Sequence, residues 1–363
     1  MHRDRVLTLA RECGFELAGV AAALPVREAA YYHQWAEAGF AGEMRYLTDR
    51  RAALRDDPRS LLPSARSIVC VGKLYNGPQP YSTRFDSDGL GWISRYAWGQ
   101  DYHDVLRQGL LRLANHLRAE SSQPFEWKIC VDTAPLLERA YARHAGLGWI
   151  GKNTCLINQA SGSWFFLGEL LLSLDLEPGA PPPDRCGTCT RCIDACPTQA
   201  IVPAGLAQGP AWALDARLCI SYFTIELRGP VPEAQRADIG RHVFGCDICQ
   251  DVCPWNRRSP VTDDPAFAAA HCAPRLEELA ALSEDEFHAM FRETPVTRAR
   301  YCGFLRNVAI AMGNAARGEF RAPLEKLAAS PDPLVADAAR WALDAIPPAA
   351  PPADPPASPA ARE

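Results

Sequence analysis

The sequence lacks any long apolar run. No uncharged apolar stretch reaches the roughly 18 residues that a membrane-spanning helix needs, and the opening residues MHRDRVLTLARECG lack the apolar segment of a signal peptide. These two absences argue against a membrane protein and against an exported one. The sequence therefore predicts a soluble, cytoplasmic protein that has no membrane partner.

An excess of positive charge is missing as well. The chain has 38 Lys and Arg against 43 Asp and Glu, which gives a formal net charge of −5 at pH 7. This balance argues against a globally basic nucleic-acid binder, although it leaves room for a local basic face. Net charge alone therefore does not identify the partner.

Cysteine, by contrast, is plentiful, and its spacing is not that of a disulfide framework. The chain has 14 cysteines, and a reducing compartment keeps most thiols free. The run CGTCTRCIDACP at 186–197 spaces four of them by three, three and four residues and closes on a proline. A second group, GCDICQDVCP, follows at 245–254, and Cys219 lies between the two. Eight cysteines therefore cluster at metal-ligand spacing.

The first run matches the bacterial ferredoxin pattern C-x₂-C-x₂-C-x₃-C-P, in which three thiolates bind one cluster and the fourth binds the other. Eight thiolates suit two [4Fe–4S] clusters. We assign one cluster to Cys186, Cys189, Cys192 and Cys253. We assign the second cluster to Cys196, Cys219, Cys246 and Cys249.

The alternative to iron–sulfur clusters is a pair of Cys₄ zinc sites, which thiolates also satisfy. Zinc ribbons use paired C-x₂-C knuckles, however, and do not need the triple spacing. The six remaining cysteines, Cys155 among them, have no partner at ligand spacing and are interpreted as small buried side chains.

The chain exceeds the roughly 250 residues that one core supports, so we expect several domains in an α+β protein. Helical patterns and apolar strand patterns such as SIVCVGKL predict an α/β domain at 1–178. The prolines of EPGAPPPD precede a ferredoxin-like two-cluster domain at 179–260. Ala/Leu-rich helices at 261–346 are spaced like a helical repeat. The Pro/Ala-rich tail at 347–363 is expected to be disordered.

Two stretches, RYAWGQDYHDVL at 95–106 and VDTAPLLERAYARHAGLGWIGKNT at 131–154, together with the cysteine run, resemble the epoxyqueuosine reductases over about residues 10–345. Enzymes of that family reduce the epoxide of epoxyqueuosine to queuosine in the wobble position of tRNA. The resemblance implies a front domain of the reductive-dehalogenase-like type, with cobalamin bound between it and the two clusters. It also implies that the C-terminal helices are a HEAT-like repeat.

By this resemblance Asp132 matches the proposed proton donor of the family. Opening an epoxide and losing its oxygen as water requires protons. An aspartate is a weak donor at neutral pH unless burial raises its pKa, and we expect its apolar neighbours to do so; they are Val131, Ala134, Pro135 and Leu136. The alternative is a structural aspartate near a helix N-terminus, where the helix dipole favours the carboxylate.

The resemblance also implies a set of cobalamin contacts, namely Arg55, Ala97, Asp132, Asn153, Gly168 and Ser221. Some family members have a cysteine where this chain has Ala97. The corrinoid motif D-x-H-x-x-G is not met, because Asp101 and His103 are followed by no glycine at the required position. A histidine-ligated cobalt is therefore not supported, and His103 is interpreted as a structural histidine.

RNA recognition calls for basic side chains interleaved with aromatic platforms. The candidates for tRNA contacts are Tyr222, Arg228, Arg298, Arg300 and Arg306. The alternative is that these side chains belong to ordinary solvated faces. The expected partners are a tRNA carrying epoxyqueuosine and an unidentified electron donor, and we expect a monomer.

Two other classes of function remain open. A reductive dehalogenase-like corrinoid enzyme would share the cobalamin and the paired clusters, but such enzymes are usually exported behind a twin-arginine signal, which this sequence does not show. An iron–sulfur electron-transfer protein would need no corrinoid at all. A ferredoxin, however, would not need a front domain of about 180 residues before its clusters.

Overall fold

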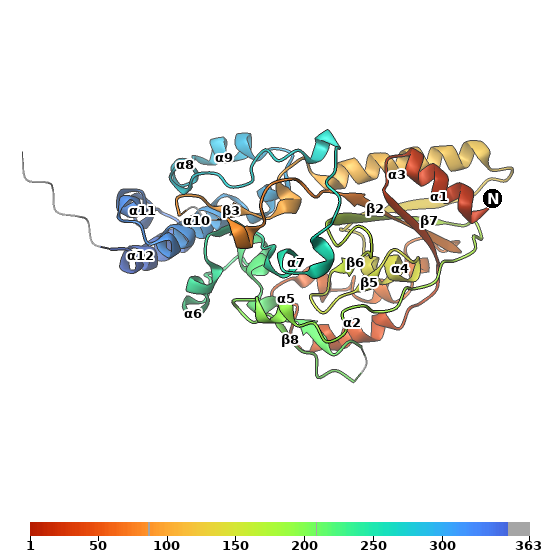
Figure 1. Ribbon diagram of the computed structural model, residues 1–363, viewed down its shortest axis with the longest axis horizontal. Coiled ribbons are helices and arrows are strands. Elements are labelled where there is room, and N and C mark those ends of the chain that lie inside the picture. The colour runs from red at the N-terminus through yellow and green to blue at the C-terminus, as the bar shows by residue number, and fades with distance from the viewer. Residues whose placement is uncertain (86–87, 208, 348–363) are drawn as a thin grey trace, which may run out of the picture.

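The computed structural model describes residues 1–85, 88–207 and 209–347. Apart from Pro347, the predicted disordered tail at 347–363 lies outside the described residues. The molecule is elongated, with a sheet at the N-terminal end and a group of helices at the other end (Figure 1). In the described ranges, no helix combines the length and apolarity that crossing a membrane would require.

The sheet of the front part has four strands in the order β1-β2-β7-β4, and all neighbours run antiparallel. The strands are β1 (Leu17–Ala22), β2 (Ser67–Leu74), β7 (Phe165–Leu172) and β4 (Trp127–Cys130). The sequences SIVCVGKL and FFLGELLL form the two central strands because continuous apolar runs suit strands that are covered on both faces. The predicted strand near Ile68–Leu74 is confirmed.

Helices cover both faces of this sheet (Figure 1). On one face lie α1 (Arg3–Glu12) and α3 (Tyr102–Glu120). The leucines of α3 recur at helical spacing and pack against β2 and β7. On the other face, α4 (Glu138–His144) packs against β1, β2 and β7. The helix α2 (Glu28–Glu37) and the small hairpin of β5 (Trp149–Ile150) and β6 (Leu156–Ile157) lie on the same side as α4.

The cysteine-rich segment consists of short elements. They are α5 (Arg191–Asp194), β8 (Ile201–Pro203), β9 (Trp212–Leu214), a π-helix (Tyr222–Glu226), α6 (Glu233–Arg236), β10 (His242–Phe244) and α7 (Ile248–Asp251). In Figure 1, α7 lies between the sheet and the C-terminal helices.

One short strand from early in the chain, β3 (Trp92–Ile93), lies outside the main sheet and pairs in parallel with β10. The residues that follow it, including Ala97 and Trp98, are buried in the same core as the C-terminal helices. The predicted domain limits at 178 and 260 stay a prediction, but this segment of the front part clearly packs into the C-terminal core.

Five helices make up the C-terminal part: α8 (Leu276–Ala281), α9 (Glu284–Met290), α10 (Tyr301–Ala315), α11 (Arg321–Ala328) and α12 (Pro333–Ala345). The predicted helical character of this region is confirmed. The central helix, α10, is buried along most of its length. It approaches α12 closely at Gly313, where a Cβ would lie 2.9 Å from the Cα of Ala342.

A buried arginine joins α10 to the cysteine-rich segment. Arg306 is 2% exposed, and its guanidinium donates to the carbonyl oxygens of Leu227 at 3.0 Å and of Gly229 and Phe223 at 2.5 Å. Phe223 lies in the single turn of the π-helix, and Leu227 and Gly229 follow it, so these carbonyls lack the partners of a regular helix. The guanidinium therefore satisfies backbone acceptors that would otherwise be buried without a donor.

We predict that Arg306→Leu destabilises the protein by about 3 kcal/mol, because three buried carbonyl groups lose their donor. The shift in the urea midpoint, followed by circular dichroism, measures this loss. The exposed Arg292 offers the matched control, and Arg292→Leu should leave the midpoint within error. An unchanged midpoint for Arg306→Leu would show that these carbonyls find other donors.

Candidate active site

Asp132 lies in the loop that joins β4 to α4, directly after the sheet ends. Its φ is 49°, in the left-handed region that non-glycine residues seldom adopt. The backbone N–H of Asp132 donates to Oε1 of Glu138 at 2.5 Å, and the side chain is 42% exposed. The alternative of a capping role does not apply, because the N-cap of α4 is Leu137 and no side chain caps it. The carboxylate of Asp132 therefore does not cap α4 and has another partner.

That partner is His103, at the start of α3. Nε2 of His103 lies 3.1 Å from Oδ2 of Asp132, and Nδ1 lies 2.6 Å from Oδ1 of Asp101. The hydrogen bond to Asp101 and then the bond to Asp132 raise the pKa of His103 to about 9. His103 is therefore a satisfied histidine, as expected, but it is protonated at neutral pH and contacts the predicted proton donor. The spacing D-x-H gave no indication of the second contact.

The expectation that apolar neighbours raise the pKa of Asp132 is wrong. Burial does act in that direction, but the hydrogen bond and charge of His103, with further help from Arg298 and Arg139, lower the pKa of Asp132 below its usual value. The imidazolium outweighs desolvation because it touches the carboxylate directly. At neutral pH the shared proton lies on His103, and Asp132 is ionised.

Three tyrosines surround this pair, and the sequence reasoning missed all of them. The ring of Tyr102 stacks on His103 with centroids 4.2 Å apart and on Phe166 with centroids 4.3 Å apart. Burial raises the pKa of Tyr46 to about 12 and raises the pKa values of Tyr96 and Tyr102 further. All three phenols are therefore neutral at physiological pH.

Arg298, which was predicted to contact tRNA, lies at this site. Its Nε is 2.7 Å from Oε1 of Glu226, its guanidinium is 5.6 Å from the centre of the Tyr46 ring, and its charge acts on Asp132. The neighbouring Glu226 ends the π-helix of the cysteine-rich segment. Arg298 therefore connects the Asp132 site to that segment.

A second connection runs through the loop between β5 and β6, residues 151–155. Nζ of Lys152 donates to the carbonyl oxygens of Gly187 at 2.8 Å and of Cys189 at 2.9 Å. Nδ2 of Asn153 donates to the carbonyl oxygen of Cys249 at 3.3 Å. One short loop of the front part thus holds both cysteine groups.

The same loop also reaches back toward Asp132. A guanidinium nitrogen of Arg139 donates to the carbonyl oxygen of Thr154 at 2.6 Å, and the charge of Arg139 acts on Asp132. Thr154 itself has a φ of 62°, which marks a tight turn. Arg139 therefore bonds to the loop that holds the cysteine groups, and its charge also acts on Asp132.

The cysteine thiols fall into two neighbourhoods. Burial and the nearby Cys253, Cys186 and Cys189 raise the pKa of Cys192 to about 11. Burial, followed by the nearby Cys219 and Cys196, raises the pKa of Cys246. A hydrogen bond with Cys155 and then burial raise the pKa of Cys249, with smaller effects of Cys246 and Cys219. Each neighbourhood contains members of one predicted set of four, and the assignment of the sets to two clusters stays a prediction.

A ninth thiol, which the sequence gave no reason to select, lies among these ligands. Cys155 forms a hydrogen bond with Cys249 and lies near Cys253. Its interpretation as a small buried side chain, made because it has no partner at ligand spacing, leaves out this contact. Only the fold of the loop at 151–155 brings it there.

The other predicted cobalamin contacts lie in different surroundings. Ser221 contacts Cys219, and Gly168 of β7 packs against α3, where a Cβ would lie 3.1 Å from Leu106. Ala97 is fully buried. Asn153 and Ser221 thus lie beside predicted cluster ligands, whereas Ala97 and Gly168 pack in the cores.

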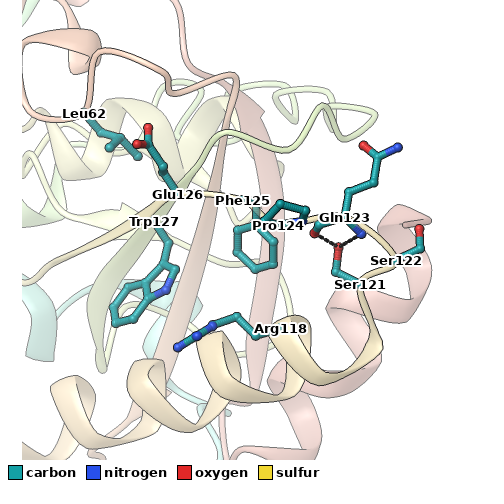
Figure 2. Close-up of a pocket in the computed structure, with 9 residues that line it drawn as sticks. All are labelled: Leu62, Arg118, Ser121, Ser122, Gln123, Pro124, Phe125, Glu126 and Trp127. Atoms are coloured by element: carbon teal, nitrogen blue, oxygen red, sulfur yellow. Dashed lines mark hydrogen bonds between the residues drawn. The ribbon is translucent and has the colours of Figure 1, made fainter.

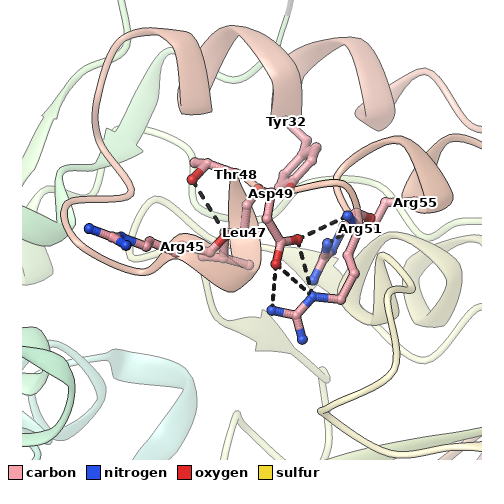
Figure 3. Close-up of polar contacts among 7 residues, drawn as sticks. All are labelled: Tyr32, Arg45, Leu47, Thr48, Asp49, Arg51 and Arg55. Carbon is pink, nitrogen blue, oxygen red and sulfur yellow. Dashed lines mark hydrogen bonds and ion pairs between the residues drawn. The ribbon is translucent and has the colours of Figure 1, made fainter.

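Arg55 lies apart, in the arginine-rich segment that Figure 3 shows. It is 7% exposed, donates to the carbonyl oxygen of Arg51 at 3.0 Å, and lies 5.5 Å from the centre of the Tyr32 ring. Arg51 itself forms an ion pair with Asp49. These contacts hold Arg55 in place through its own segment.

Two of the predicted tRNA contacts are not available to RNA in this structure. Tyr222 is 6% exposed and accepts a hydrogen bond from the backbone N–H of Glu43, and Arg306 is buried among carbonyl groups as described above. Both side chains were expected on a surface because their helix and π-helix could not be placed from sequence. Arg228 and Arg300 are exposed.

A cavity of about 680 Å³ lies elsewhere, between the end of α3 and the start of β4 (Figure 2). Its lining includes Arg118, near the C-terminal end of α3, and Trp127, at the start of β4. His103 lies at the N-terminal end of α3, and Asp132 follows the end of β4. Because α3 has 19 residues, it is about 28 Å long. This cavity is therefore not part of the candidate active site.

Comparison with known proteins gives the chain its relatives. The family described as "Epoxyqueuosine reductase QueG, DUF1730" matches residues 55–133, and the "4Fe-4S double cluster binding domain" matches residues 185–256. The epoxyqueuosine reductase of Xanthomonas campestris pv. campestris is 42% identical over 345 residues, which cover 93% of this chain and 94% of that protein.

Solved structures agree. A crystal structure of epoxyqueuosine reductase with an epoxyqueuosine-modified stem loop of tRNA-Tyr matches with a TM-score of 0.84 and 29% identity, covering 94% of this chain and 89% of that one. The Bacillus subtilis epoxyqueuosine reductase, with its catalytic aspartate loop swung out of the active site, matches with a TM-score of 0.82 and 28% identity, at the same coverage. The chain belongs to the epoxyqueuosine reductase family.

Proposed function

We propose that this protein reduces the epoxide of epoxyqueuosine to queuosine in the wobble position of tRNA. Removing the epoxide oxygen as water and leaving a double bond requires two electrons and two protons. The observation that carries the proposal is the Asp132–His103 pair, joined through the loop at 151–155 to two neighbourhoods of cysteines. A proton source and a place for electron carriers thus adjoin each other in a chain of this family.

We assign one [4Fe–4S] cluster to Cys186, Cys189, Cys192 and Cys253, and the other to Cys196, Cys219, Cys246 and Cys249. Cobalamin would lie between the clusters and the front sheet, and Asn153 and Ser221 are the proposed contacts closest to the cysteines. When bound, the clusters and the cobalamin supply the two electrons. Arg55, Ala97 and Gly168 complete the proposed set, of which the last two support the site through packing.

Asp132 delivers a proton to the substrate in this proposal, and His103 supplies it. Nε2 of His103 gives its proton to Oδ2 of Asp132, and the carboxylic acid then passes a proton to the leaving oxygen. Asp101 keeps the imidazole oriented through Nδ1 and stabilises its charge. The exposed part of Asp132 leaves the carboxyl open to a substrate that enters from the cluster side.

The tRNA is proposed to bind across the cysteine-rich segment and the C-terminal helices, which we interpret as a HEAT-like repeat. Arg228 and Arg300 are exposed there and can neutralise phosphates. The tRNA substrate would place the reaction in the cytoplasm. An unidentified donor would supply the electrons to a monomeric enzyme.

We predict about eight iron and eight sulfide per chain after anaerobic reconstitution, because eight thiolates supply two clusters. Cys196→Ser should abolish the cluster that Cys219, Cys246 and Cys249 share, and should leave the cluster of the first run. Electron paramagnetic resonance and iron analysis measure both losses. Cys302→Ser, on α10, is the control and should keep the full iron content. Stoichiometric zinc without iron uptake would contradict the assignment.

We predict that Asp132→Asn keeps both clusters and cobalamin but loses about 100-fold or more of epoxide reduction, because the amide cannot donate the acidic proton. The wild-type rate should be present below pH 9 and fall as the pH rises through about 9, where His103 loses its proton. His103→Gln should lower the rate and remove that fall. Single-turnover rates from pH 6 to 10 provide the measurement, and an unchanged profile in His103→Gln would exclude His103 from proton supply.

We predict that binding of an epoxyqueuosine stem-loop weakens steeply with salt and that Arg300→Ala lowers the salt slope by about one unit. Arg66→Ala is the control and should leave the slope unchanged; Arg66 directly precedes β2 in the front sheet and pairs with Asp175. The stem-loop should turn over far better than the free nucleoside, which lacks the remote contacts. A chlorinated phenol as the preferred substrate would favour a dehalogenase, and reducible clusters without any turnover would favour an electron-transfer protein.

A further inference from the structure

A carboxyl group lies buried in the middle of the front sheet. Glu169 is on β7, where it faces Cys70 of β2 and Cys130 of β4 across the two neighbouring strand pairs, and it is 0% exposed. Among the residues that the structure describes, no N–H or hydroxyl group donates to either of its oxygens. An ionised carboxylate in such a place would have neither water nor a donor to stabilise it.

The partner of Glu169 is a second carboxyl group. Glu138, the first residue of α4, lies near Glu169, because α4 packs on β7 and the charge of Glu138 acts on the Glu169 carboxyl group. An ionised Glu169 would face that charge with no donor on either of its oxygens. We therefore expect the two carboxyl groups to hold at least one proton between them.

Glu138 also touches the loop of the proposed proton donor. Its Oε1 accepts the backbone N–H of Asp132, the residue whose φ is 49°. An ionised Glu138 is the better acceptor of this bond, which leaves the proton to Glu169. The chain of contacts thus runs from the Glu169 carboxyl group through the Glu138 carboxylate to the backbone of Asp132.

The charged and titratable groups around the pair favour retention of the proton. They are Cys70 on β2, Cys130 on β4, Tyr102 on α3, and Asp132 and Arg139 on either side of Glu138. Arg139 is the cation among them, and it is engaged at the carbonyl oxygen of Thr154. Burial, followed by the charge of Asp132, raises the pKa of Glu138 to about 7, and burial with the charge of Glu138 raises the pKa of Glu169 well above its usual value.

We propose that the buried Glu169, as a carboxylic acid, and the half-buried Glu138, as a carboxylate, form a pair that positions the Asp132 loop for proton delivery. Both are positioning residues, because neither carboxyl group contacts the Asp132 carboxylate or the substrate. The inference rests on the proposed role of Asp132 in the reaction. Its physical basis is the hydrogen bond that the backbone N–H of Asp132 donates to Glu138, which offsets the strain of the left-handed Asp132 backbone.

Loss of the shared proton would dismantle this arrangement. Two adjacent carboxylates repel each other, and the fully buried Glu169 has no water to stabilise its charge, so Glu138 would move away from Glu169 and from the loop. Asp132 would then lose the acceptor of its N–H, and its carboxylate would lose its fixed distance from His103. The pair thus links the protonation of a group inside the sheet to the geometry of the site.

The first test needs no cofactor. We predict that the cofactor-free protein shows, at pH 7, the infrared C=O band of a protonated carboxyl group, and that Glu169→Gln removes it. Because the folded pKa of the pair is raised, the folded protein binds more protons than the unfolded chain, so thermal stability should fall as the pH rises from about 5 through 7 and beyond. Glu169→Gln should reduce that fall, since the amide is neutral at every pH. Glu28→Gln is the control and should keep the band; Glu28 is on α2 and pairs with Arg143 and His144 at the C-terminal end of α4.

The second test connects the pair to catalysis. Glu169→Gln should retain turnover, because the amide N–H can still donate to Glu138, whereas Glu138→Ala should lower kcat on the order of tenfold with KM unchanged, because the loop loses its acceptor. An absent carboxyl band in the wild type overturns the pair. A normal band with normal kcat in Glu138→Ala overturns its positioning role. Full activity of Asp132→Asn would instead remove the proposed function of Asp132 and leave the acid pair standing.

Discussion

The contact on which the arrangement of the site depends is made by one loop of five residues. Lys152 and Asn153 donate from the loop at 151–155 to carbonyl oxygens of both cysteine groups. The front sheet and the cysteine-rich segment are otherwise separate in sequence, and the cysteine-rich segment has only short elements of its own. Because Lys152 and Asn153 bond to backbone carbonyls, they help to position the two cysteine groups and leave the thiols available as ligands.

The charges around Asp132 lower its pKa, whereas burial alone would raise the pKa of an aspartate. The site contains the carboxyl groups of Asp101, Asp132 and Glu138, with the cations His103 and Arg139 between or beside them. Each carboxylate that accepts from His103 makes the imidazolium harder to deprotonate. Such a site holds its proton on His103, which lies between Asp101 and Asp132. In the proposed function, this proton restores Asp132 to its acid form.

The sequence was sufficient for the parts of the structure that follow from local patterns. The spacing of Cys186 to Cys196 pointed to thiol neighbourhoods, and the apolar run SIVCVGKL predicted the central strand β2. The direction of the pKa shift of Asp132 could not be predicted from sequence, because it depends on a contact with His103, which lies on helix α3, distant in sequence. In the same way, nothing local distinguishes the buried Arg306 from the exposed Arg300. Glu169 in FFLGELLL looks like the polar position of a strand, and only the layer of helix α4 above it makes it buried.

The parallel pairing of β3 with β10 has a consequence for how the protein is made. Trp92 and Ile93 leave the ribosome long before His242 and Phe244, yet their ladder is complete only when both segments are present. The core that then encloses them also includes helices up to α12. Contacts between such distant segments form slowly, because the entropy cost of closing a long loop comes before the contacts can stabilise the fold. Trp92 and Trp98 lie in this core, so they reach their buried positions only when nearly the whole chain has been synthesised.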